Sequence, residues 1–110
     1  MKTRSLTDLV HFSEDDPRRE VLYETEHLFS QVVSLQGNQQ LGPISDAGSD
    51  AILTVLAGGI SAQVGKGRAR MGQWETTLVP AGEALTVRNA SEEPSVVLLV
   101  VAPPPPDEET

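Results

Sequence analysis

Short runs of β-branched and other apolar residues, separated by turn residues, cover most of this chain and restrict it to a small set of folds. Glycine, proline, asparagine or aspartate closes one run after another, at intervals of roughly 8–12 residues. This rhythm predicts an all-β domain, a sandwich or barrel of about eight short strands. Because only Phe12, Tyr23, Phe29 and Trp74 are aromatic, the core must be mostly aliphatic. Strands are expected around Val21 and at residues 28–35, 51–57, 60–64, 68–71, 75–79, 84–89 and 95–102.

The chain divides into a lead-in, one β domain and a tail. Residues 1–19 are polar and acidic, which predicts a solvated lead-in with a short helix or strand. Residues 20–102 hold the expected strands, with a loop at 39–50, and 110 residues suffice for one domain but not for two. The apolar run at 95–102 predicts a strand buried on both faces. Residues 103–110 (PPPPDEET) predict a proline-rich, acidic, disordered tail.

Charge narrows the range of partners. The chain has 8 Lys and Arg residues against 16 Asp and Glu residues, a formal net charge of −8. A surface of this sign repels phosphate backbones and anionic lipids, so we expect neither a nucleic-acid nor a membrane partner. The chain has no cysteine, which excludes disulfides and thiolate metal ligands. Its apolar runs are shorter than the ~20 residues that span a bilayer, and we expect a cytoplasmic protein.

Two motifs in the second half carry a family resemblance. Residues 78–89 (LVPAGEALTVRN) predict a strand, a tight Pro-Ala-Gly turn and a returning strand that ends in Asn89. Upstream, residues 55–58 (VLAG) end a strand at Gly58. In this order and at this separation the motifs resemble those of the cupin superfamily, in particular of small single-domain cupins. The resemblance covers residues 42–101 and implies a double-stranded β-helix, a jelly-roll β-barrel.

The resemblance also locates the positions that hold the metal ion in this family. The two histidines and the glutamate of the first motif fall at Ile44, Asp46 and Ala51, and the histidine of the second motif falls at Leu85. Transition-metal sites take three or four protein ligands, and only Asp46 has a donor atom in its side chain. We therefore expect no metal cofactor and assign no catalytic residue. Ile44, Ala51 and Leu85 would instead give the barrel an apolar floor.

Two polar residues of the first long strand are further candidates for ligand contacts. His27 alternates with Phe29, Gln31 and Val33, so it is expected to share their strand face. In cupins the corresponding strand lines the barrel, which would bring His27 and Gln31 to a ligand. An exposed or purely structural role is the alternative for His27. The full set of candidate ligand-binding residues is His27, Gln31, Ile44, Asp46, Ala51 and Leu85.

One position departs from the second motif. Members of the family usually have a glycine six residues before the proline of the turn, and this chain has Trp74 there. Either the neighbouring Gly72 takes over the bend, or Trp74 itself lies at the bend, exposed or capping the mouth of the barrel.

Three functions remain open from the sequence. We favour a metal-free cupin-like module, small-molecule-binding or regulatory, without catalysis, whose ligand is a small apolar or amphipathic molecule. The second function is a cupin-class enzyme, an isomerase or dioxygenase-like protein, whose displaced metal site would require Asp46, His27 and Gln40 to converge. The third is a structural protein with a filled barrel. Small cupins usually dimerise, so the resemblance also implies a homodimer.

Overall fold

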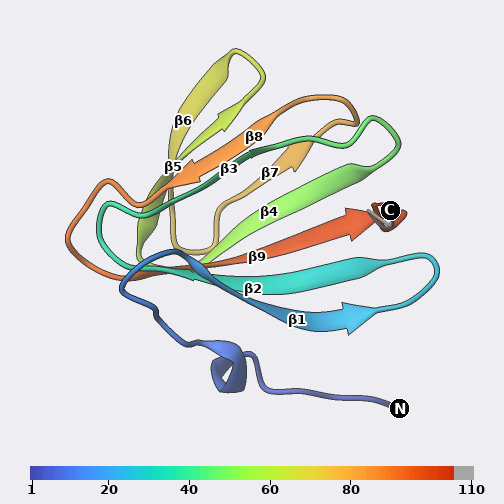
Figure 1. Ribbon diagram of the computed structural model, residues 1–110, viewed down its shortest axis with the longest axis horizontal. Helices are drawn as coiled ribbons and strands as arrows, with labels where there is room; N and C mark the ends of the chain where they lie inside the picture. The colour runs from blue at the N-terminus through green and yellow to red at the C-terminus, as the bar shows by residue number, and fades with distance from the viewer. Residues whose placement is uncertain (106–110) are drawn as a thin grey trace.

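The computed structural model describes residues 1–105, which form nine strands preceded by one 3-10 helix (Figure 1). The helix η1 spans Leu6–Leu9. The strands are β1 (Arg18–Glu24), β2 (Phe29–Leu35), β3 (Gln40–Ile44), β4 (Asp50–Ala57), β5 (Gly59–Val64), β6 (Gly67–Gly72), β7 (Thr76–Val79), β8 (Leu85–Arg88) and β9 (Ser95–Ala102). The predicted all-β class is confirmed. Residues 106–110 of the predicted disordered tail lie outside the described residues. Within residues 1–105, no helix has the length and apolar character needed to cross a membrane.

The strands form two antiparallel sheets that pack against each other (Figure 1). The five-stranded sheet has the order β1-β2-β9-β4-β7, and the four-stranded sheet has the order β3-β8-β5-β6. Strands far apart in the sequence are therefore neighbours: β9, near the end of the chain, lies between β2 and β4. This antiparallel arrangement of two sheets is that of a jelly roll.

Aliphatic side chains fill the space between the sheets. Successive side chains of a strand point to opposite faces, and the inward-pointing set forms one buried cluster. Apart from Met71 the cluster is built from Val, Leu, Ile and Ala, as the composition predicts. Its buried members are Val33, Leu35, Leu41, Leu53, Val55, Ile60, Ala62, Met71, Val79, Leu85, Val87, Val97 and Leu99.

The first residues of strand β9 are buried on both faces, as its apolar run predicts, whereas Leu98 and Val100 on the outer face are half-buried. Val97 and Leu99 point into the core between the sheets. Val96 points to the outer face of the five-stranded sheet, where it packs with Val32 and with Leu9 of η1. The lead-in is thus not simply solvated, because η1 covers part of this outer face.

The structure corrects two strand boundaries. Residues 39–50 are predicted as a loop, but Gln40–Ile44 form β3, which pairs with β8. Gly42 and Pro43 are poor strand formers, and the register shifts between Leu41 and Ile44. Strand β3 forms because β8 offers it an edge, a non-local cause that local propensity does not reveal. Strand β1 begins at Arg18, two residues before the expected start of the domain.

Glycines at the two motif turns adopt backbone conformations that other residues rarely adopt. Gly58 has φ +73° and Gly82 has φ +88°. A Cβ atom at position 58 would lie 2.5 Å from the carbonyl oxygen of Pro94, so a side chain cannot fit there. Trp74 also has a positive φ, +74°, and is 73% exposed. Of the two alternatives for the second motif, the structure therefore shows that Trp74 itself lies exposed at the bend.

Candidate functional site

One end of the barrel contains a pocket, the candidate ligand-binding site. It lies where β2, β4 and β8 begin and β3, β7 and β9 end, on the right in Figure 1. Its volume is about 270 Å³. The pocket is lined by Arg19, Phe29, Gln31, Ile44, Ser45, Asp46, Ser49, Ala51, Val79, Pro80, Glu83, Leu85, Leu99, Val101 and Pro105.

Aliphatic side chains from both sheets form the floor of this pocket. Ile44 and Leu85 are partners across β3 and β8, in the four-stranded sheet. Ala51 and Val101 are partners across β4 and β9, in the five-stranded sheet. The four positions at which the resemblance places metal ligands, 44, 46, 51 and 85, therefore all border one pocket.

The residues at these four positions do not fit a metal ion. The side chains of Ile44, Ala51 and Leu85 have no donor atom, which leaves the carboxylate of Asp46 where three or four ligands are needed. That carboxylate also has a local role, since its Oδ1 accepts a hydrogen bond of 2.8 Å from the backbone nitrogen of Gly48. In the described part of the chain, no three His, Cys, Asp or Glu side chains are grouped so that they could hold a metal ion.

Hydrogen bonds between loops fix the rim of the pocket. The backbone nitrogen of Gly82, in the Pro-Ala-Gly turn, donates to the carbonyl oxygen of Asp46 at 2.9 Å. The nitrogen of Ala81 donates to Oδ1 of Asp50 at 2.9 Å. Ser49 Oγ donates to the carbonyl oxygen of Pro103 at 2.6 Å. The β3–β4 loop, the β7–β8 turn and the segment after β9 are thus tied together, so the pocket is preformed.

A pair of polar side chains from β1 and β2 faces the apolar floor. Gln31 lines the pocket and is only 3% exposed. Its Oε1 accepts a hydrogen bond of 3.1 Å from Nε of Arg19. Arg19 stands opposite Val33, and Val21 stands opposite Gln31, so Arg19 and Gln31 lie diagonally across the β1–β2 ladder on the same face of the sheet. A guanidinium and an amide at an apolar pocket are groups that can orient a polar ligand head.

The structure places His27 away from the other five candidates. His27 is exposed in the turn between β1 and β2, where its backbone nitrogen donates to Oγ1 of Thr25 at 3.1 Å. The nitrogen of Thr25 also donates to the carbonyl oxygen of Leu28, which closes the turn before β2 begins at Phe29. The apolar alternation that continues into β2 therefore does not include His27, and His27 is not one of the described residues lining the pocket.

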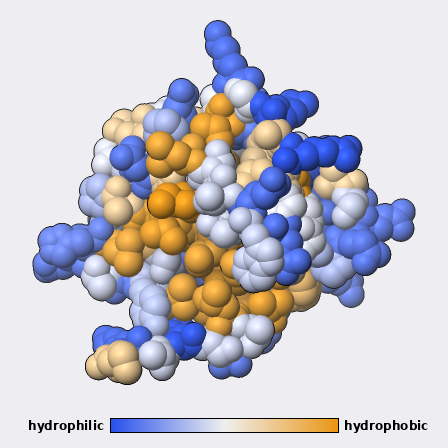
Figure 2. All heavy atoms as spheres, turned by 180° about the vertical axis from the view of Figure 1, so that it is seen from behind, coloured by the Kyte–Doolittle hydropathy of each residue, from blue (hydrophilic) through white to orange (hydrophobic). Residues whose placement is uncertain are grey.

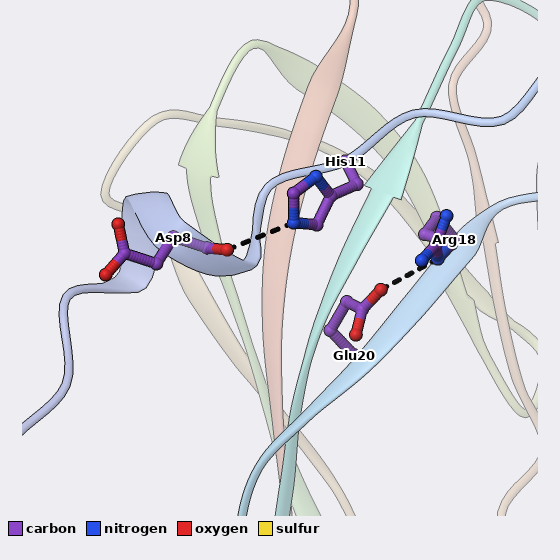
Figure 3. A network of polar contacts seen from close by, with 4 residues as sticks. All are labelled: Asp8, His11, Arg18 and Glu20. Atoms are coloured by element: carbon purple, nitrogen blue, oxygen red, sulfur yellow. Dashed lines mark hydrogen bonds and ion pairs between the residues drawn. The ribbon is translucent and has the colours of Figure 1, made fainter.

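The residues required for a displaced metal site do not converge in the described structure. Asp46 borders the pocket, His27 lies in the β1–β2 turn, and Gln40 begins β3, where it pairs with Arg88. The second histidine, His11, follows η1, and its Nε2 lies 3.1 Å from the carbonyl oxygen of Asp8 (Figure 3).

Arg19 is the basic pocket residue that sequence reasoning missed. It falls in residues 1–19, the predicted lead-in, although it belongs to β1. The sequence contains a weak signal for Arg19. A polar and an apolar residue stand two positions apart at Arg19 and Val21, as they do at Gln31 and Val33 on the next strand. Extending the strand backwards from Glu20 along this alternation would have included Arg19.

No protein-family model matches the sequence, and no curated protein matches it. Solved structures do match. TT1209 from Thermus thermophilus has a TM-score of 0.92 and 26% identity, over 96% of this chain and 100% of that chain. An uncharacterized conserved protein with a double-stranded β-helix domain from Klebsiella pneumoniae has a TM-score of 0.87 and 22% identity, over 94% and 90%. An RmlC-like cupin protein from Desulfovibrio desulfuricans has a TM-score of 0.84 and 22% identity, over 94% and 98%.

These matches confirm the fold that the two motifs predict. The chain is a double-stranded β-helix protein. More particularly, it has the fold of the small RmlC-like cupin proteins. The likeness defines the architecture but no activity, and the Klebsiella pneumoniae protein is itself described as uncharacterized.

Proposed function

We propose that this cupin-fold protein binds a small amphipathic molecule at the open end of its barrel and acts as a metal-free binding or regulatory module without catalysis. The observation that carries the proposal is the pocket of about 270 Å³, whose floor is built from Ile44, Ala51 and Leu85. Apolar walls with a few convergent polar groups are typical of small-molecule sites. The volume lies just below the ~300–1,000 Å³ of pockets for drug-sized ligands, which favours a smaller molecule.

The distribution of the core favours binding over a purely structural barrel. Leu35, Val55 and Val97 are fully buried and close the end of the barrel opposite the pocket. At the pocket end, Ile44, Ala51 and Val101 are only partly buried. A filled barrel would bury the side chains at both ends equally, whereas part of the pocket end of this barrel remains accessible.

A cupin-class enzyme, an isomerase or a dioxygenase-like protein, has less support. Its displaced metal site would have to draw on Asp46, His27 and Gln40, which come from separate parts of the barrel. Elemental analysis of protein purified without a histidine tag or chelator separates the two functions. Near-stoichiometric iron, manganese, zinc or nickel would contradict the proposal.

Binding itself is tested by thermal unfolding with a panel of short fatty acids, alcohols and phenols. A ligand at a hundred times its Kd stabilises the folded state by about 2.7 kcal/mol. Ala51→Leu places a larger side chain in the pocket and should abolish the stabilisation. Ala90→Leu, at an exposed position outside the pocket lining, is the matched control and should preserve it. A panel without effect on the native chain would contradict the proposal.

We also propose that the protein is a homodimer, as the resemblance implies, and that it works in the cytoplasm. The dimer is supported by Ile52 and Leu78, cross-strand partners that are 48% and 59% exposed on the outer face of the five-stranded sheet. Val100 of β9 stands beside Ile52 on the same face. Figure 2 shows a broad group of apolar side chains on one side of the molecule. Exposed apolar patches of this kind commonly mark protein interfaces.

A further inference from the structure

The amide of Gln31 has a donor that the described protein does not use. The side chain is 3% exposed, and its Oε1 is occupied by Nε of Arg19. Among residues 1–105 its Nε2 has no hydrogen-bond partner. Within that range, Ser34 Oγ is the single fully buried side-chain nitrogen or oxygen without a hydrogen-bond partner. The unpartnered Nε2 of Gln31 is therefore not fully enclosed. Because buried polar groups are normally hydrogen-bonded, an amide nitrogen that opens onto the pocket indicates a site for an acceptor.

Arg19 adds further donors at the same place. Its Nε is held by Gln31, which orients the guanidinium at the pocket. Within residues 1–105, the one ion pair joins Nε of Arg18 to Oε2 of Glu20 at 2.7 Å (Figure 3). Arg18 stands opposite Ser34 and Arg19 stands opposite Val33, so the two arginines point to opposite faces of β1. The positive charge of Arg19 therefore has no carboxylate partner in the described chain, although it borders an apolar floor.

The remaining charges limit the kind of anion. Asp46 and Glu83 also border the pocket, and the chain carries a net charge of −8. These charges oppose a dianion such as a phosphate monoester. A carboxylate carries a single charge, and its two oxygens match the planar donor fork of a guanidinium.

Resting on the proposed function, we infer that the ligand is a small monocarboxylate with an apolar body. Arg19 and Gln31 hold the carboxylate, and the aliphatic floor around Leu85 takes the body. The guanidinium supplies charge and direction, while the amide of Gln31 fixes the depth at which the head group stops. The site should therefore prefer a carboxylate to a neutral molecule of the same shape, because the neutral molecule leaves these donors without a strong acceptor.

The test compares three probes with six-carbon chains: hexanoate, hexanamide and hexyl phosphate. Their Kd values are measured by NMR titration of the full chain labelled with nitrogen-15, at one pH and salt concentration. We expect hexanoate to bind about tenfold tighter than hexanamide, since charge-assisted hydrogen bonds are about twice as strong as neutral ones. We expect hexyl phosphate to bind more weakly than hexanoate.

Variants of Arg19 and Gln31 test whether these two residues cause the preference for hexanoate over hexanamide. Arg19→Leu and Gln31→Leu should each reduce the preference for hexanoate over hexanamide, and Arg19→Leu should nearly abolish it. Arg18→Leu is the matched control, because it removes the same charge from the neighbouring position on the opposite face. It should preserve the preference, which separates a direct contact from a change in overall charge.

The outcomes separate this inference from the function on which it rests. Equal binding of hexanoate and hexanamide would overturn the carboxylate head group and leave the apolar pocket as a binding site. Tighter binding of hexyl phosphate would overturn the preference for a monoanion. Binding of none of the three probes would overturn the proposed function itself.

Discussion

Trp74 has a backbone conformation that normally belongs to glycine. Its φ of +74° lies in the left-handed region, and the resemblance places a glycine at this position. Two hydrogen bonds hold the bend: the nitrogen of Trp74 donates to the carbonyl oxygen of Val55 at 2.8 Å, and the nitrogen of Glu75 donates to that of Gly72 at 3.0 Å. The bend is thus kept by its backbone partners, while the indole is 73% exposed. The side chain gains little burial to offset the strain.

We therefore expect Trp74→Gly to be about 1 kcal/mol more stable than Trp74→Ala. A residue with a Cβ atom is destabilised by roughly 1–2 kcal/mol in the left-handed region. Glycine avoids this strain, but the larger conformational entropy of its unfolded chain offsets part of the gain. Both variants remove the indole, so the difference between their free energies of unfolding isolates the effect of the backbone conformation. Urea unfolding of the two variants measures it. An alanine variant as stable as the glycine variant would show that the bend carries no strain.

Among the strands, local sequence predicts those that form because of their own residues. The run at residues 95–102 has enough β-branched and apolar residues to identify β9. Asn89 is also explained by its surroundings: it is fully buried, and its Nδ2 donates to the carbonyl oxygens of Leu35 and Glu93. Strand β3 is not predicted by its own residues, which favour a turn, because its pairing with β8 is decided by the tertiary structure.

The residues of the candidate site also divide into those that the local sequence locates and those that it does not. The turns of the two motifs are fixed by Gly58 and Gly82, so counting along the chain from them leads to Ile44 and Leu85, which border the same pocket. Arg19 could not be reached in this way, because it lies outside both motifs and meets Gln31 only across the β1–β2 ladder. Alternation alone predicts that His27 shares the strand face of Gln31, but alternation does not locate the residue at which a strand begins.

The convergence of β3, β4 and β8 on one pocket can be tested by building a metal site there. We expect the variant with Ile44→His, Asp46→His, Ala51→Glu and Leu85→His to bind manganese or zinc, because these positions border one cavity and would supply four ligands. Elemental analysis should find near-stoichiometric metal. Thermal unfolding should show about 2.7 kcal/mol of stabilisation at a hundredfold excess over Kd.

The single variant Leu85→His is the control for that experiment, since one histidine beside Asp46 supplies too few ligands. It should take up much less metal than the fourfold variant. A fourfold variant that folds, as judged by its circular dichroism, but binds no metal would show that the three strands do not aim these side chains at a common point.

At the scale of the whole molecule, charge is distributed unevenly. Four of the 8 basic residues lie on β6, on β8 or in the turn before β6: Lys66, Arg68, Arg70 and Arg88. The rest of the surface is correspondingly more acidic, and two copies of a chain with a net charge of −8 repel each other at long range. Contact between copies is least opposed where a surface carries no charge. The row Val100, Ile52 and Leu78, on the outer face of the five-stranded sheet, is such a surface.

The proposed homodimer should therefore depend on this apolar row. In a symmetric dimer the same patch is used on both copies, so one Leu78→Lys substitution places two new charges in the contact. We expect sedimentation equilibrium to give twice the chain mass for the native protein and the monomer mass for Leu78→Lys. Gln40→Lys adds the same charge at an exposed position of β3, in the four-stranded sheet, and should remain a dimer. A native protein that sediments as a monomer would contradict the homodimer. A Leu78→Lys variant that stays dimeric would instead assign the contact to another surface, such as the free edge of β1.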